Sequence, residues 1–376
     1  MTNLKKVAFV LHPMNVSEFK EKTFFYSPFD SLIAWLLNQL SPQIVKKCFQ
    51  KLPPHNFMCV HNLKSALNFK IDVLGIMCGV FPEEVVVNKE MALKKVLNAI
   101  KYAIRKGAQI IVLTGFTSIA CNDEQYLSEI VRNNNVVITS GNTLTAALAI
   151  EGVLEASQWL EVNPANLTIS IVGATGDIGS ICAKILAKKF RKIILCSRNI
   201  RQDDPVVREI SFLNDKITIE NDSSKAIKHA EVVLLATSSF IPLINPVDIK
   251  PYSIICDVSL PYNLTDDFTV RRKDIFAFDG GRATTINCHS SNKKWLNFVR
   301  DNSIYGCVAE GLALGFERAR KNFSINRGEI TEANILEIRD LSNRNGFGLA
   351  GFSFHGRLYS REELNTYRDL FVKRYH

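Results

Sequence analysis

The sequence predicts an α/β protein with a parallel, doubly wound sheet. Short β-branched runs alternate with amphipathic helices, which is the pattern of buried parallel strands joined by helical crossovers. A Gly-rich turn at 173–179 stands between a β-branched run at 167–172 and a helix, as in sheets of this kind. We therefore expect an N-terminal α/β domain at 1–165, a Rossmann-type domain at 166–300, and a C-terminal helical segment at 301–376 that returns to a cleft between the lobes.

The N-terminal domain takes its strands from four short apolar runs. These runs lie at 7–11, 71–80, 109–114 and 136–139. The stretch 91–105 repeats apolar residues at helical spacing and predicts an amphipathic helix. A second long helix is expected at 142–160, and the turn at 163–166 after it marks the domain boundary.

An unusually apolar helical stretch at 28–50 stands out in this domain. It is interrupted near Pro42 and is followed by Lys46 and Lys47. The favoured interpretation is an ordinary pair of core helices. The functional alternative is an entrance for a long apolar substrate, or a face that makes peripheral contact with a membrane.

The second domain alternates strands and helices, as βαβ units do. Strands are expected at 167–172, 192–196, 231–236 and 253–258, with helices at 178–190 and near 223–229. The C-terminal segment predicts a long helix from Ser303 to about Asn322. Two further helices are expected at 331–344 and 361–375, separated by the Gly-rich loop 346–351.

Composition excludes several classes of protein. Apolar residues form 47% of the chain and charged residues 22%, which is an ordinary globular profile. No apolar run approaches the roughly 18 residues that span a bilayer, and we find no export signal, so we expect a cytoplasmic protein. The formal charge of +9 is dispersed and accompanies no nucleic-acid motif. A phosphorylated cofactor or an acidic protein partner fits that charge.

The chemistry-bearing residues also exclude some sites. The nine cysteines and seven histidines show no metal-ligand spacing, so neither a disulfide framework nor a metal site is expected. The sequence contains no Gly-x-Ser-x-Gly, which removes the usual serine hydrolase.

The turn at 173–179 is a G-x-x-G-x-x-G form of the dinucleotide fingerprint. Gly173 permits the tight turn, Gly176 lets a pyrophosphate approach the helix N-terminus, and Gly179 allows close packing of helix on sheet. The next strand ends in Ser-Arg-Asn at 197–199 rather than in an acid, and a guanidinium suits a ribose 2′-phosphate, so NADPH is favoured. The expected cofactor contacts are Gly173, Ala174, Thr175, Gly176, Asp177, Ile178, Gly179, Ser197, Arg198, Asn199, Thr237, Ser238 and Val258.

Cys307 is the candidate reactive group. It is expected in the first turn of a helix, where the helix dipole stabilises a thiolate over a thiol. Small neighbours, Gly306 and Gly311 among them, leave room for a substrate. On these residues alone, a cysteine that merely packs among small residues is the commoner interpretation.

Several short motifs follow one another along the chain between about residues 85 and 347. They are Gly115-Phe-Thr-Ser-Ile119, Thr139-Ser-Gly-Asn-Thr143, the turn 172–180, Ser197-Arg-Asn199, Cys307-Val-Ala-Glu310 with Phe316-Glu317, and Asn322-Phe-Ser324 followed by Asn326 or Arg327. In this order and spacing they resemble the long-chain acyl-[acyl carrier protein] reductases, the aldehyde-forming enzymes of cyanobacterial alkane synthesis. The two-lobed layout also resembles shikimate dehydrogenases and glutamyl-tRNA reductases.

The resemblance implies an enzyme that uses NADPH and a cysteine nucleophile, which it carries onto Cys307. The substrate would be an acyl thioester of acyl carrier protein or coenzyme A, the product a fatty aldehyde, and a further partner an aldehyde-consuming enzyme. We expect catalytic roles for Cys307, Ser118 and Thr143, and substrate contacts from Gly115, Phe116 and Asn142. Ser118, Asn142 and Thr143 are the candidate oxyanion donors, with turn-forming and helix-capping roles as the alternative.

Three features depart from that family. Leu144 stands where the family's Gly-Asn-Thr segment continues with a His. The first eighty or so residues match poorly, and the tail from 351 to 376 has no counterpart.

Glu310, one turn beyond Cys307, is a candidate proton donor or a salt-bridge partner for Arg318 or Arg320.

Two other functions stay open. The first is an NADP-dependent dehydrogenase of a small hydroxy or amino acid, which should place a Lys–Asp pair or a carboxylate-binding Arg in the cleft. The second is a non-catalytic NADP(H)-binding sensor. Full activity in Cys307→Ala would favour the first, and cofactor binding without turnover would favour the second.

Overall fold

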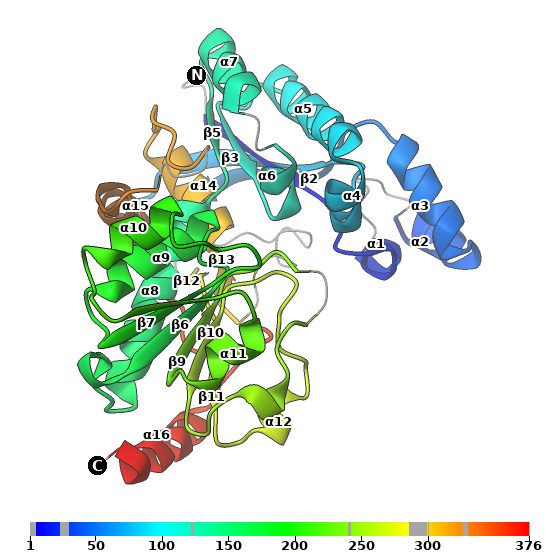
Figure 1. Ribbon diagram of the computed structural model, residues 1–376. Helices are drawn as coiled ribbons and strands as arrows, with labels where there is room; N and C mark the ends of the chain where they lie inside the picture. Colours follow the sequence, from blue (N-terminus) through cyan, green and yellow to red (C-terminus); the bar gives the residue numbers. More distant parts are fainter. Residues whose placement is uncertain are drawn as a thin grey trace.

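The chain folds into two lobes, each built on its own sheet (Figure 1). The computed structural model describes residues 5–22, 30–121, 124–239, 242–285, 299, 301–325 and 330–375. Asn326 and Arg327, quoted with the family resemblance, lie outside these residues, as does the start of the 28–50 stretch. Among the described residues, every helix is too short or too polar to span a bilayer.

The sheet of the first lobe has the strand order β2-β3-β1-β4-β5. The four predicted strands are confirmed, with shifted ends, as the parallel strands β1 (Lys5–Leu11), β3 (Lys70–Met77), β4 (Ile110–Leu113) and β5 (Val137–Thr139). The edge strand β2 (His55–Lys64) is antiparallel and absent from the prediction. Polar residues interrupt its apolar pattern, and two register irregularities break its alternation.

Helices from distant parts of the sequence cover the two faces of this sheet. Val10 packs in a core cluster with the apolar face of α5 (Lys89–Arg105), which confirms the predicted helix. Phe9 points to the other face, where it meets α14 (Gly306–Phe316). A Cβ added at Gly311 of α14 would lie 3.0 Å from the Phe9 ring, so the helix sits directly on the strands.

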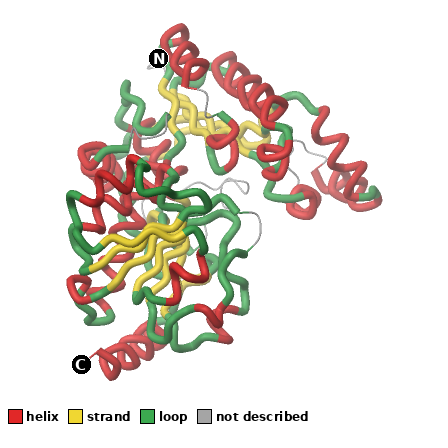
Figure 2. The backbone as a smooth tube through the Cα atoms, in the orientation of Figure 1, coloured by secondary structure: helices red, strands yellow, loops and turns green. Residues whose placement is uncertain are grey.

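The second lobe carries a six-stranded parallel sheet (Figure 2). Its spatial order β8-β7-β6-β9-β10-β11 is the 3-2-1-4-5-6 order of dinucleotide-binding domains, which confirms the Rossmann-type prediction. The strands are β6 (Thr168–Val172), β7 (Lys192–Cys196), β8 (Ile217–Glu220), β9 (Val232–Leu235), β10 (Ile254–Asp257) and β11 (Phe276–Asp279). The connecting helices include α9 (Asp177–Ala187), α10 (Pro205–Ser211) and α11 (Ser223–Lys228).

The predicted helix at 303–322 is wrong at both ends. Residues Ser303–Tyr305 form β13 instead, which pairs antiparallel with β12 (Arg282–Thr284). The helix that follows, α14, ends at Phe316 and packs against α8 (Asn142–Trp159) as well as the first sheet. Helix α14 thus completes the first lobe. The division into domains at 1–165, 166–300 and 301–376 stays a prediction.

The tail beyond Gly351 packs along the outer strand of the second sheet. The carboxylate of Asp279 accepts hydrogen bonds from the Ser353 hydroxyl and from the backbone N–H groups of His355 and Gly356, at 2.7–2.9 Å. The Tyr359 hydroxyl donates to the carbonyl of Ala277 at 2.7 Å. The predicted helices of this region are confirmed as α15 (Glu332–Arg344) and α16 (Arg361–Tyr375).

The apolar stretch near the N-terminus forms a helical hairpin, α2 (Asp30–Gln39) and α3 (Pro42–Lys51), beside α1 (Val16–Lys22). The break near Pro42 is confirmed. Phe49 of α3 is buried against other rings, so this side is core. The favoured core-helix interpretation is wrong for the opposite side, because Trp35 is 59% exposed and Leu32 and Leu36 are about as exposed.

Candidate active site

A cleft of about 580 Å³ lies between the lobes and is lined by residues of both. It brings together, from the predicted site, Gly115, Phe116, Ser118, Asn142, Gly176, Asp177, Ile178, Thr237, Ser238, Val258 and Cys307. The residues that do not line it are Thr143, Gly173, Ala174, Thr175, Gly179, Ser197, Arg198 and Asn199. Most of the second set belong to the Gly-rich turn and to the end of β7, and Thr175, Arg198 and Asn199 among them are exposed.

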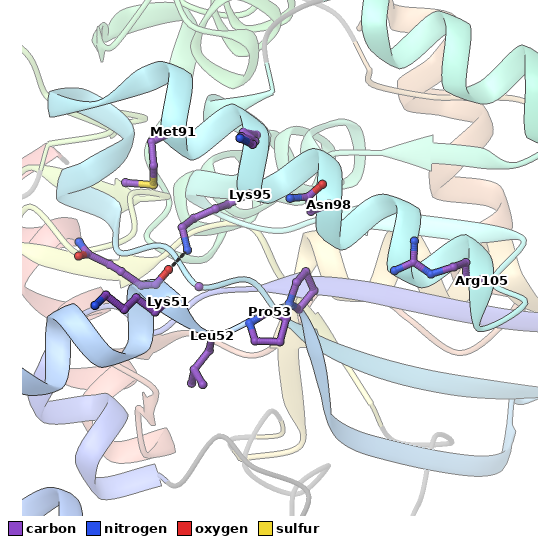
Figure 3. A pocket seen from close by; sticks show the side chains of 11 residues that line it. Lys51, Leu52, Pro53, Met91, Lys95, Asn98 and Arg105 are labelled. Atoms are coloured by element: carbon purple, nitrogen blue, oxygen red, sulfur yellow. Dashed lines mark hydrogen bonds between the residues drawn. The ribbon is translucent and has the colours of Figure 1, made fainter.

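A second cavity, of about 400 Å³, opens between the end of α3 and α5 (Figure 3). Lys95 crosses it and donates to the carbonyl of Gln50, which ties α5 to α3. Its lining residues include several cations but no thiol, carboxylate or imidazole. The thiol and carboxylates that the proposed chemistry requires are therefore found in the larger cleft, which contains Cys307.

The Gly-rich turn has the geometry that a dinucleotide requires. Gly173 has φ +93°, and a Cβ there would overlap the carbonyl of Ala236. Gly179 lies so close to the Gly173 carbonyl that only glycine fits, which sets α9 directly on the sheet. Helix α9 begins at the N-cap Gly176 without a capping side chain, and Gly176, Asp177 and Ile178 line the cleft, so the end of the helix that favours an anion such as a pyrophosphate lies at the cleft.

The end of β7 holds the turn and presents a cation beside it. The Ser197 hydroxyl accepts a hydrogen bond from the Thr175 N–H at 3.1 Å and lies 3.0 Å from the Thr175 hydroxyl. Arg198 and Asn199 are exposed next to it. This arrangement fits a 2′-phosphorylated ribose, because a free guanidinium follows the strand where an NAD-binding domain has a carboxylate.

Cys307 lies in the first turn of α14, at the meeting point of three segments. Gly141, the N-cap of α8 with φ +74°, abuts it so closely that a Cβ would overlap the Cys307 backbone. The Gly306 N–H donates to the carbonyl of Gly281 at 2.8 Å, which brings in the loop after β11. Of the eight cysteines within the described residues, Cys307 is the one that lines the cleft.

The electrostatic surroundings of Cys307 oppose ionisation. Burial, together with the negative charge of Glu310, raises the pKa of the thiol to about 12. The N–H groups of Val308 and Cys307 in the first helical turn lower that pKa, as the helix position predicts, but burial is the larger effect. The protonated thiol is therefore the resting form at neutral pH.

Glu310 is fully buried and joins α14 to α8. Its carboxylate accepts hydrogen bonds from the Thr139 hydroxyl and, at 2.7 Å, from the N–H of Leu144 in the first turn of α8. Burial raises the pKa of this carboxyl to about 7. Its partners among the described residues are therefore neutral groups of the first lobe rather than Arg318 or Arg320, and Leu144, at the family's His position, donates through its backbone N–H.

The predicted oxyanion donors occupy different surroundings. Ser118 lines the cleft, but its hydroxyl donates to the carbonyl of Gly115 at 2.7 Å. Asn142 lines the cleft opposite the Gly-rich turn, with its amide 3.5 Å from the Asp177 carboxylate. Thr143 is buried, and its hydroxyl donates to the carbonyl of Phe323 at 3.1 Å. The structure thus does not bring Thr143 to the cleft, and its position there is that of a packing residue.

Several polar residues of the cleft escape the sequence analysis, among them Arg282 and Tyr262. Arg282 follows the Gly280-Gly281 pair and is only 3% exposed. Its Nη1 and the Tyr262 hydroxyl are buried without a hydrogen-bond partner among the described residues. The double glycine after the last strand is the one sequence signal for this place, and it does not identify Arg282 as a buried residue.

Comparisons with known proteins agree with this architecture. The family model described as shikimate / quinate 5-dehydrogenase matches residues 154–279. Aminotransferase PigE of Serratia sp. is 28% identical over 284 residues, which are 75% of this chain, and the chain spans 32% of PigE. The long-chain acyl-[acyl-carrier-protein] reductase of Synechococcus elongatus is 30% identical over 267 residues, 68% of this chain and 76% of that protein. The chain belongs to the family of this reductase.

Among solved structures, a malic enzyme of Entamoeba histolytica aligns over 98% of this chain and 81% of its own, at 11% identity and a TM-score of 0.44. The reductase match and the dehydrogenase model both support an oxidoreductase as the broad class of this chain.

Proposed function

We propose that this chain is an oxidoreductase that reduces a fatty acyl thioester to a fatty aldehyde, with Cys307 as the nucleophile and NADPH as the reductant. The observation that carries the proposal is the position of Cys307 in the first turn of α14, on the same cleft that Gly176, Asp177 and Ile178 line. Membership of the acyl-[acyl-carrier-protein] reductase family supports it.

The residues of the second lobe fit NADPH. Gly176 and the first turn of α9 would hold the pyrophosphate, and Ser197 and Arg198 the phosphorylated ribose. Thr237, Ser238 and Val258, at the ends of the central strands, line the cleft toward Cys307. NADPH, when bound, supplies the two electrons and the hydrogen that convert the acyl group to an aldehyde.

Cys307 would carry the acyl group between the two half-reactions. Its sulfur attacks the thioester carbonyl, the bond to the carrier thiol breaks, and the carrier thiol leaves with the proton that Cys307 gives up. Because the negative charge of Glu310 opposes the thiolate, acyl transfer is favoured when Glu310 is protonated. A Glu310 pKa of about 7 places that change at physiological pH.

The partners follow from the same proposal. An acyl carrier protein, which is acidic, suits a chain with a formal charge of +9, and acyl-CoA is the alternative donor. The exposed apolar side of α2–α3 would make peripheral contact with a membrane that takes up an apolar product. An aldehyde-consuming enzyme would be the third partner.

The direct test is to incubate the protein with a palmitoyl thioester, on acyl carrier protein or on coenzyme A, without NADPH, and to measure its intact mass. We expect one added palmitoyl group in the wild type, none in Cys307→Ala, and its discharge as hexadecanal when NADPH is added. Cys182→Ala, which changes a buried cysteine outside the cleft, is the matched control and should acylate normally. If neither thioester leaves an adduct on a protein that binds NADPH, the proposal fails.

One observation favours a second candidate function. A dehydrogenase of a small hydroxy or amino acid needs a carboxylate-binding arginine in the cleft, and Arg282 is a buried arginine there. Such an enzyme would not need Cys307, so full activity in Cys307→Ala with a small acid as substrate would establish it instead.

A further inference from the structure

Arg282 is a buried cation without an anionic partner among the described residues. Its Nε and Nη2 donate to the Ser303 hydroxyl at 3.0 and 2.9 Å, and Nη2 lies 3.4 Å from the Ser303 carbonyl. These partners are neutral. An arginine stays charged at every physiological pH, and burying its charge unpaired is costly. A buried arginine of this kind is suited to an anionic ligand or intermediate that is present only during the reaction.

The orientation of the guanidinium is fixed by its neighbours. Ser303 holds one edge, and the ring of Tyr305 lies under the plane at 4.7 Å from its centre. Both residues belong to β13, which pairs with the strand that carries Arg282. The remaining nitrogen, Nη1, is buried and unpartnered in the wall of the cleft that contains Cys307. The positive charge also lowers the pKa of Cys307, so its field reaches the thiol.

Tyr262 offers a second donor in the same wall. Its hydroxyl is buried without a partner among the described residues, and burial keeps its pKa far above the usual range, so it stays protonated. The ring stacks on His355 at 4.3 Å with an interplanar angle of 11°, and His355 stacks on Phe354 at 4.2 Å. The C-terminal tail thus fixes the position of a residue that lines the cleft.

We propose that Arg282 Nη1, assisted by the Tyr262 hydroxyl, binds the oxygen anion that forms when Cys307 attacks the acyl thioester. This assignment rests on the proposed function. As the bond from the Cys307 sulfur to the carbonyl carbon forms, the π electrons move onto the oxygen, and Arg282 donates to it. When the carbon–oxygen double bond reforms, the bond to the carrier sulfur breaks, and the leaving carrier thiolate takes the proton that Cys307 gave up. Fixed donors at such an oxygen stabilise the transition state more than the ground state.

The same guanidinium would suit the carboxylate of a small acid substrate, since both ligands present an anionic oxygen. The two ligands differ in the step of the reaction at which they need Arg282. A carboxylate is charged before and after reaction, so losing its partner weakens binding and raises KM. A thioester oxygen becomes charged only during the reaction, so losing its partner slows acylation with little change in KM.

The test measures single-turnover acylation of Cys307 by palmitoyl-CoA, through intact mass, in three variants. Arg282→Lys keeps the charge but not the fork, and we expect acylation about 100-fold slower or more, with KM within about threefold. Tyr262→Phe removes a hydroxyl that has no described partner, so it should fold normally and acylate about tenfold more slowly. Arg272→Lys, an arginine paired with Asp274 in the second lobe, should match the wild type.

Unchanged thermal melting and NADPH affinity in Arg282→Lys and Tyr262→Phe would separate this effect from misfolding. Acylation within about threefold of the wild type in both variants would overturn the assignment and leave the proposed function standing. A wild type that forms no adduct, but oxidises a small hydroxy acid with a KM that rises in Arg282→Lys, would instead assign Arg282 to a carboxylate. That outcome would overturn both proposals.

Discussion

Glu310 has two roles that pull in opposite directions. Ionised, its carboxylate accepts hydrogen bonds from the Thr139 hydroxyl and the Leu144 N–H, and so fixes α14 against the start of α8. The same negative charge raises the pKa of Cys307, one helical turn away. Glu310 therefore both positions Cys307 and opposes ionisation of its thiol. The second effect is present only at a pH where Glu310 is ionised.

Replacing Glu310 by Gln should make Cys307 more reactive. The amide is isosteric and uncharged, so we expect the pKa of Cys307 to fall and its alkylation by iodoacetamide to rise about tenfold at pH 8. Below pH 7, where the wild-type Glu310 is protonated, the two proteins should react alike. Peptide mass spectrometry after timed alkylation across pH 6–9 gives the rate at Cys307 alone.

Glu155→Gln, which removes an exposed carboxylate of α8, is the control for that measurement and should leave the rate unchanged. Equal alkylation rates for Glu310→Gln and the wild type at pH 8 would show that the Glu310 charge does not act on the thiol.

Residue patterns predicted the parts of the site that local sequence specifies. A side chain at position 173 or 179 would overlap the backbone, so glycine is required at both. A glycine motif in the sequence therefore predicts this geometry. Cys307 was assigned through the family resemblance, because the residues around it alone favoured a packing role. Arg282 and Tyr262 could not be predicted, because their burial depends on the pairing of β12 with β13 and on the stack with His355 from the tail. Those contacts join segments far apart in the sequence.

At the level of elements, predictions succeeded where one periodicity ran through a whole segment. Helix α5 and the strands β6, β7, β9 and β10 of the second sheet are of this kind, whereas β8 and β11 were not predicted. Residues 303–305 were assigned to a helix because their apolar pattern continues into α14, whereas hydrogen bonds to β12 hold them as a strand. The α2–α3 hairpin shows the same limit, because an apolar pattern predicts a helix but not whether another element covers it.

The α2–α3 hairpin should bind anionic membranes. Leu32, Trp35, Leu36 and Ile44 are exposed, with Lys47 and Lys51 on the exposed side of α3. Apolar side chains among cations suit an anionic lipid surface. We expect wild-type protein to sediment with phosphatidylglycerol vesicles, less so at high salt. Lys47→Glu should weaken binding by at least about fivefold, since each basic residue contributes about 1 kcal/mol.

A double variant, Trp35→Ser with Leu36→Ser, should lose most vesicle binding without losing NADPH binding. Phe212→Ser is the control, because Phe212 is 90% exposed at the end of α10 and should not matter. Vesicle binding that is equal in all variants, or a wild type that elutes as a dimer that the double variant abolishes, would contradict membrane contact through this face.

In the whole molecule, the first lobe is completed by a helix from the last fifth of the sequence. Residues 1–165 alone would leave the α14 side of the first sheet, with Val7 and Phe9, exposed to water. We expect this fragment to bind the dye ANS strongly and to aggregate, whereas the intact chain does neither. A monomeric fragment with a cooperative thermal transition and no dye binding would show that the lobe is independent of α14.

The late position of α14 has a consequence for how the protein is made. A chain leaves the ribosome N-terminus first, and its domains ordinarily fold as they emerge. Here one face of the first sheet stays uncovered until residues 306–316 have been synthesised. The strands of the second sheet are all synthesised before that helix. Nascent or truncated chains would expose that apolar face to chaperones and to one another. Only a chain that has been synthesised through α14 can bury the sheet, and the same helix places Cys307 at the cleft.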